Sequence, residues 1–151
     1  GAVTFVSGVD DERFIELYAQ ASMAVVPSLY EGFSLPAIEA MACGVPLIAT
    51  TGGALPEVAG RNGEAALLVP PGDPSALAHA IGTALADPEL RERIGAAGRA
   101  RVLNRYTWRK TAELTVEQYR RAISEQRAGK RPLPAPVALP ETVSTTKAPA
   151  C

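Results

Sequence analysis

Short apolar runs and longer amphipathic stretches alternate along the chain, and each kind predicts one type of secondary structure. The short runs at residues 3–6, 24–27, 45–50 and 65–69 are typical of buried parallel strands. Between them, apolar residues recur every three or four positions, as on the buried face of a helix. The alternation predicts an α/β fold with a Rossmann-like parallel sheet and flanking helices.

Short polar side chains that can bond the first free amides of a helix precede four of the predicted helices. They are Asp10 (or its neighbour Asp11), Ser34, Asp73 and Asp87. The first helix runs to about Gln20, and the second covers about residues 35–43. The third and fourth begin with a proline and carry apolar stripes of Leu77, Ile81 and Leu85, and of Leu90, Ile94 and Ala97. We expect these two helices to be scaffolding.

A last helix is predicted from about Thr107 to Gln126. Its apolar stripe, for which core packing is the default expectation, consists of Trp108, Ala112, Val116, Tyr119 and Ile123. Beyond it the composition shifts to Pro, Ala, Thr and Lys without periodicity. The sequence therefore predicts one domain over residues 1–126 and a disordered tail over residues 127–151.

Composition and charge narrow the class of protein. A content of 47% hydrophobic and 21% charged residues is typical of a globular domain, and we expect a cytoplasmic protein because the chain shows no export signal and no disulfide framework. Residues 89–131 hold twelve basic and five acidic side chains, whereas residues 1–88 hold two basic and ten acidic ones. The basic carboxyl-terminal helices either face solvent or contact the anionic surface on the inner face of a membrane. Nucleic-acid binding is not expected, because no reading motif is present.

Two isolated acids point to a ligand site. Glu31 and Glu39 are the only charged residues between Leu17 and Pro56, in a run otherwise apolar or small. Buried carboxylates need donors, water or a hydroxyl-rich ligand. Gly32 allows a tight turn after the strand at residues 24–27, and the free amides of Gly32, Phe33, Ser34 and Leu35 would face an anion at the helix start.

Glu39 lies just over one turn into that helix, and its side chain leans back toward the amino terminus. We therefore expect the carboxylates of both acids to face the same ligand site at the start of this helix. The turn after the next strand contains Gly52 and Gly53, which either admit a bound phosphate or sugar or form an ordinary turn.

The run Glu31-Gly-Phe-Ser-Leu-Pro-Ala-Ile-Glu39, followed by Ala-Met-Ala-Cys-Gly and later Gly52-Gly53, resembles the donor-site signature of the retaining glycosyltransferases of family 4. The resemblance covers roughly residues 1–125. It implies the carboxyl-terminal lobe of a GT-B enzyme, with no metal or organic cofactor and a UDP- or GDP-sugar as substrate. Glu31 would hold hydroxyls of the donor sugar as the catalytic position, and Glu39 would bind the ribose. The amides from Gly32 to Leu35, with Gly52 and Gly53, would line the sugar and diphosphate.

The implied reaction transfers a hexose, with retention, to a hydroxyl of a glycan, lipid or small-molecule acceptor. The family also places an Arg and a Lys on the diphosphate, but no basic residue occurs between Arg13 and Arg61. We therefore expect a fragment that lacks the first strands of the lobe and is inactive without an amino-terminal domain. The alternative is a non-catalytic nucleotide-sugar or phosphate-binding module that acts with a partner chain. A glycosidase is less favoured, because it needs an acid and a nucleophile or base on either side of the scissile bond, whereas Glu39 lies within a helix beside the predicted phosphate site. A receiver-like signalling domain is less favoured, because it needs an acidic cluster at the strand ends and Glu31 is alone there.

Overall fold

The computed structural model describes residues 2–129 of the chain. The chain divides into two compact units, residues 1–112 and residues 113–151. The elements are α1 (Asp11–Gln20), β1 (Ala24–Val26), α2 (Leu35–Ala42), β2 (Leu47–Thr50), α3 (Leu55–Ala59), β3 (Leu67–Val69), α4 (Pro74–Ala86), α5 (Pro88–Arg105) and α6 (Trp108–Arg127). The predicted tail falls, from residue 130 on, outside the described residues.

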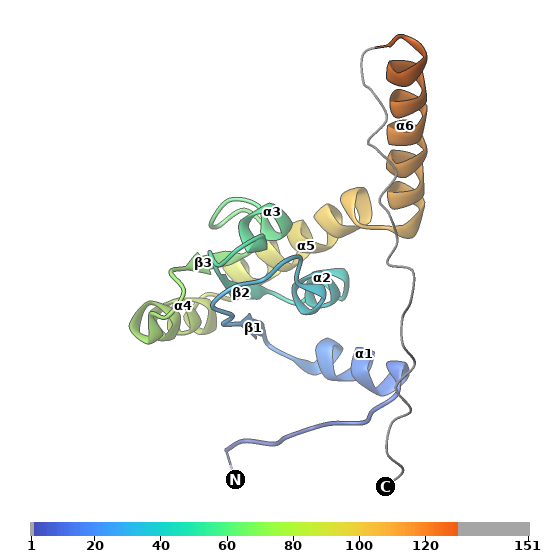
Figure 1. The fold of residues 1–151 in the computed structure, drawn as a ribbon. Helices are drawn as coiled ribbons and strands as arrows, with labels where there is room; N and C mark the ends of the chain where they lie inside the picture. Colours follow the sequence, from blue (N-terminus) through green and yellow to red (C-terminus); the bar gives the residue numbers. More distant parts are fainter. Residues whose placement is uncertain (1, 130–151) are drawn as a thin grey trace, which may run out of the picture. The chain divides into compact units, whose positions relative to one another are not determined.

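The described strands form a parallel sheet in the order β1-β2-β3, which confirms the predicted fold class. Side chains of the central strand β2 alternate between two cores. Leu47 and Ala49 pack with residues of α2, α3 and α5, whereas Ile48 packs with Ala80 and Ala84 of α4. The helices thus cover both faces of the sheet (Figure 1), and all three strands end at the edge where α/β proteins bind ligands.

Glycines let α5 approach α2 closely. A Cβ atom at Gly95 would overlap the carbonyl oxygen of Gly44, and one at Gly98 would lie 3.2 Å from Cγ of Met41. The side chain of Arg99 also donates a hydrogen bond to the carbonyl oxygen of Ala42 at the carboxyl end of α2. The contact between α2 and α5 therefore depends on the absence of side chains on one helix.

Three of the predicted caps are confirmed. The carboxylates of Asp10, Asp73 and Asp87 accept hydrogen bonds of 2.8, 2.9 and 2.9 Å from the amides three residues further on. The helices that they begin are α1, α4 and α5. The fourth cap, Ser34, is wrong: its side chain makes no capping bond.

The predicted strand at residues 3–6 is also wrong. Within the described residues this segment pairs with no strand, and Val3, Phe5 and Val6 are 70%, 94% and 51% exposed. A β-strand needs a neighbour to satisfy its amides and carbonyls, so an apolar run alone does not produce one.

The stripe of α6 does not form a core in the described structure. None of the residues of α6 is buried, and Trp108, Tyr119 and Ile123 are 89%, 66% and 53% exposed. Leu85 of α4, predicted to pack, is exposed too, because Ala80 and Ala84 make the close contacts of that helix. The spacing of both stripes is helical, but nothing in the spacing supplies a surface to cover them.

Candidate donor site at the carboxyl edge of the sheet

The loops that follow β1 and β2 are joined through one threonine. Thr50, the last residue of β2, donates a hydrogen bond of 2.5 Å from its hydroxyl to the carbonyl oxygen of Ser28. The same hydroxyl oxygen accepts a 3.3 Å bond from the amide of Gly52. Thr50 is buried, so this connection is shielded from water. It fixes the position of the β1–α2 loop that carries Glu31.

Glu31 is held by both its side chain and its backbone. Its Oε1 accepts a hydrogen bond of 2.7 Å from the hydroxyl of Ser28, and its carbonyl oxygen accepts one of 2.8 Å from the amide of Ala54. The side chain is half-buried. The carboxylate therefore has one oxygen with no hydrogen bond among the described residues, in a loop with a fixed backbone.

Gly52 and Gly53 allow the close approach of the chain's own backbone. A Cβ atom at Gly52 would lie 2.5 Å from the carbonyl oxygen of Leu29, and one at Gly53 would overlap the backbone of Glu31. Gly53 also has a φ of +62°, which disfavours other residues. These glycines thus form a turn against the Glu31 loop, and their contact with a ligand stays a prediction.

Ser34 has an unusual conformation immediately before α2. Its φ and ψ of 67° and 78° are left-handed, and it is the only non-glycine residue with a positive φ in the described part of the chain. Gly32, where the sequence predicted the tight turn, does not have a positive φ. The hydroxyl of Ser34 is buried, at 4% residue exposure, and has no hydrogen-bond partner in the described structure. A left-handed serine costs about 1–2 kcal/mol, and an unpaired buried hydroxyl costs about 1–3 kcal/mol.

The apolar residues on either side of Ser34 lie at the surface. Phe33 and Leu35 are 49% and 61% exposed. The ring of Phe33 packs edge to face on that of Tyr106, with 5.8 Å between their centroids. Tyr106 is itself fixed by a 3.0 Å bond from its hydroxyl to the carbonyl oxygen of Glu57. The loop therefore presents apolar surface beside the amino end of α2.

Glu39 lies in a groove of about 650 Å³ between α1 and α2. Phe14 and Tyr18 of α1 form one side of this groove, and Arg99 of α5 contributes to it as well. Burial raises the pKa of Tyr18, and the negative charge of Glu39 raises it further. Glu31 does not line this groove. The two acids thus sit in different immediate surroundings, and their convergence on one ligand stays a prediction.

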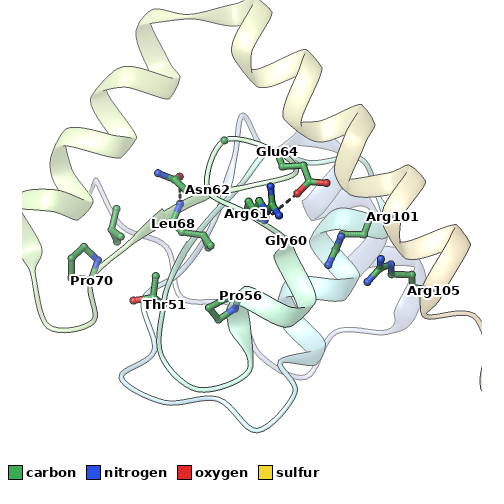
Figure 2. A pocket seen from close by; sticks show the side chains of 12 residues that line it. Thr51, Pro56, Gly60, Arg61, Asn62, Glu64, Leu68, Pro70, Arg101 and Arg105 are labelled. Atoms are coloured by element: carbon green, nitrogen blue, oxygen red, sulfur yellow. Dashed lines mark hydrogen bonds between the residues drawn. The ribbon is translucent and has the colours of Figure 1, made fainter.

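Sequence reasoning missed a second and larger cleft, of about 1250 Å³, beside α3 and α5 (Figure 2). Arg61, Arg101 and Arg105 line it. The excess of basic residues in residues 89–131 was visible, but it gave no position for such a cleft.

Residues 2–129 contain neither a candidate metal cluster nor a membrane-spanning helix. No group of three or more His, Cys, Asp or Glu side chains there could hold a metal ion. No described helix combines the length and the apolar character that crossing a bilayer requires.

Residues 1–101 match the sequence profile of the family described as glycosyl transferases group 1. The chain belongs to the group 1 glycosyltransferases. Its β1–α2 loop, with Glu31 and Ser34, lies within the matched residues of this family.

This group 1 glycosyltransferase chain is similar in sequence and structure to several named proteins. It is 48% identical over 118 residues to an MMP alpha-(1->4)-mannosyltransferase of Mycolicibacterium hassiacum, a match that covers 78% of the chain and 29% of the relative. The structure of sucrose-phosphate synthase from Thermosynechococcus elongatus matches with a TM-score of 0.73 and 44% identity, over 80% of the chain and 30% of that protein. Anabaena HepE, solved in complex with UDP-glucose, matches with a TM-score of 0.59 and 26% identity, over 76% and 29%.

The chain spans about three tenths of the length of these relatives. Its parallel sheet and flanking helices match the carboxyl-terminal domain of GT-B glycosyltransferases.

Proposed function

We propose that this chain binds a nucleoside-diphosphate sugar, with UDP or GDP as the nucleotide, and supplies the donor half of a retaining hexosyltransferase site. Glu31 holds hydroxyls of the sugar, Glu39 holds those of the ribose, and the amides from Gly32 to Leu35 face the diphosphate. Gly52 and Gly53 support this loop from the next strand. The acceptor is a hydroxyl of a glycan, a lipid or a small molecule.

The observation that carries this proposal is Ser34. Residues in strained conformations persist where the surrounding structure enforces them, and they gather at ligand sites. Ser34 combines a left-handed backbone with an unpaired buried hydroxyl directly before α2. The first amides of a helix are free donors and carry the positive end of its dipole. A diphosphate at this place would meet those amides, and its oxygens are acceptors for a serine hydroxyl.

Stabilising the leaving diphosphate is the main chemical task of such a transfer. Negative charge grows on the diphosphate as the bond to the sugar breaks, and donors fixed in advance lower that barrier. The α2 amides provide part of this. No basic residue lies between Arg13 and Arg61, so further positive charge has to come from elsewhere in the enzyme. We therefore expect the chain alone to bind a donor without transferring the sugar.

Known structures of relatives support a nucleotide sugar as the ligand. Anabaena HepE was solved with UDP and with UDP-glucose, and it matches 76% of this chain. A cytoplasmic location and peripheral contact between the basic carboxyl-terminal helices and a membrane remain predictions from the sequence.

Isothermal titration calorimetry of the chain with UDP-glucose and GDP-mannose tests donor binding. We expect saturable binding of one of them, weakened about tenfold or more in Glu39→Gln, since a charged hydrogen bond contributes about 1.5–3 kcal/mol. Glu12→Gln, which removes the same charge from the exposed side of α1, should bind normally. Absence of saturable binding by either sugar nucleotide would refute the donor site.

Transfer and its stereochemistry need a separate measurement. The chain with a donor and a mixture of acceptors should give no product by mass spectrometry. Product formed by the chain alone would contradict the expected inactivity, and an inverted anomeric configuration in the NMR spectrum of a product would contradict retention.

A further inference from the structure

The cleft between α3 and the carboxyl-terminal half of α5 is strongly basic. Three arginines line it, and Glu64 is the one acidic side chain among its lining residues, which leaves two net positive charges. Leu68, Val69 and Pro70 give it an apolar wall. None of the predicted donor residues lines this cleft, and the lining residue nearest to them in sequence is Thr51, which precedes Gly52.

Arg101 has a structural explanation. Its Nε donates a 2.7 Å hydrogen bond to the carbonyl oxygen of Val58, and one of its terminal nitrogens donates a 2.8 Å bond to that of Glu57. These carbonyls belong to the last turn of α3, whose own helix leaves them free. Arg101 thus caps α3, and its charge is fixed at the wall of the cleft.

Arg61 and Arg105 have no such explanation. In the part of the chain that the structure describes, neither guanidinium group makes a hydrogen bond or an ion pair. Arg105 lies one turn beyond Arg101 on the same side of α5, as Figure 2 shows. Like charges at this spacing repel and destabilise a helix, so their proximity does not stabilise the fold.

The loop that carries Arg61 is ordered by hydrogen bonds. The amide of Arg61 donates to Glu64 Oε2 at 3.1 Å, and the amide of Leu68 donates to Asn62 Oδ1 at 2.8 Å. Arg93 of α5 donates a 2.9 Å bond to the carbonyl oxygen of Gly63. Arg61 therefore extends from a backbone fixed relative to α5, which suits a preformed site.

We propose that this cleft binds a small phosphate ester. Arg61 and Arg105 donate to the phosphate oxygens, because a guanidinium group presents paired donors that match a phosphate. Arg101 adds a fixed positive charge, and two net charges balance a doubly ionised phosphate. The apolar wall and the volume of about 1250 Å³ leave room for the carbon skeleton of the ester.

Calorimetric titration of the chain with glucose 6-phosphate, inorganic phosphate and glucose at constant ionic strength tests the site. We expect saturable binding of glucose 6-phosphate and none of glucose. Tighter binding of the ester than of inorganic phosphate supports an ester ligand, whereas equal binding overturns the ester and leaves free phosphate as the ligand. No saturable binding of either phosphate compound overturns the site itself.

Substitutions of single arginines test whether glucose 6-phosphate binds in this cleft. Arg61→Gln and Arg105→Gln should each weaken glucose 6-phosphate binding about tenfold or more, because each removes a charged hydrogen bond. Arg105→Lys, which keeps the charge but loses the paired donors, should weaken it less. Arg120→Gln removes the same charge from exposed α6, outside the cleft, and should change it less than about twofold. Equal weakening by Arg120→Gln would show diffuse charge attraction and overturn the proposal.

A folding control and a titration with a sugar nucleotide show whether this site is separate from the donor site. Circular dichroism melting should show that the variants fold, as expected for exposed side chains. Titration with whichever of UDP-glucose and GDP-mannose binds the unchanged chain should give the same affinity for Arg61→Gln, whereas Glu39→Gln should weaken binding of that sugar nucleotide and keep glucose 6-phosphate binding. Joint loss of both ligands in Arg61→Gln would show that there is one site and overturn the second.

Discussion

Helices α2 and α6 both carry apolar residues at helical spacing, yet only α2 is buried. In α2, eight residues long, Ala37, Ala40 and Met41 have no exposed surface and Ile38 has 9%. In α6, twenty residues long, no residue is buried. Glycines on α5 admit α2 to close contact, since a Cβ atom at Gly98 would lie 3.2 Å from Cγ of Met41. A stripe therefore shows which side of a helix can pack, and the rest of the fold decides whether it does.

The largest expected effect compares one residue from each helix. Met41→Ala should lower the free energy of unfolding by about 2–5 kcal/mol, because it leaves a cavity in the core under α2. Tyr119→Ala on α6, which is 66% exposed, should change it by less than about 0.5 kcal/mol. Urea denaturation of both variants measures the two values. Equal losses would mean that α6 packs as tightly as α2.

The glycines that admit α2 give a second test. Gly95→Ala should destabilise the chain by about 1–3 kcal/mol, since its Cβ overlaps the carbonyl oxygen of Gly44. Gly82→Ala in α4 meets no atom within 4 Å and should stabilise the chain by up to about 1 kcal/mol through helix propensity. Thermal melts of the pair would contradict the close α2–α5 contact if both substitutions raised the melting temperature.

Ser34 tests whether the start of α2 is shaped for a ligand or for stability. Ser34→Ala removes an unpaired buried hydroxyl and keeps the backbone conformation, so we expect a gain of up to about 1 kcal/mol in the free energy of unfolding. We also expect weaker binding of UDP- or GDP-sugar by calorimetry. The control is Ser124→Ala on α6, whose hydroxyl already donates a 2.8 Å bond to the carbonyl oxygen of Arg121. A loss of stability with unchanged donor binding would assign Ser34 a purely structural role.

The smallest expected effect concerns Tyr18 in the groove beside α2. The pKa of Tyr18 is raised from 10.0 in the folded chain, first by burial and then by Glu39. The protonated phenol therefore stabilises the fold below its unfolded pKa, and this stability is lost as pH rises through the higher folded value. Tyrosinate absorbance during alkaline titration should contain a component from Tyr18 that disappears in Tyr18→Phe and ionises at lower pH in Glu39→Gln. Identical titration curves for Glu39→Gln and the unchanged chain would show that the charge of Glu39 does not act on Tyr18.

Local rules predicted much of the fold because they act between near neighbours. Asp10, Asp73 and Asp87 cap their helices as their position before the apolar spacing indicated. Ser34 did not: its backbone is left-handed, which local preference disfavours, and its hydroxyl has no partner in the described structure. Glu31 and Glu39 were proposed as site residues from their isolation and from the family signature, and that role stays a prediction. The basic cleft was not, because Arg61 and Arg105 are 44 positions apart in the chain.

The sequence by itself determined the strand and helix alternation, the family, and the acids of the candidate donor site, since each depends on residue type at short spacing. Only the tertiary structure decided that residues 3–6 form no strand in the described chain and that α2 packs while α6 stays exposed. It also decided that Ser34 has no partner and that three arginines share one cleft. The physical reason is that burial and pairing depend on what lies opposite a residue, and that partner is set by folding rather than by neighbours in sequence.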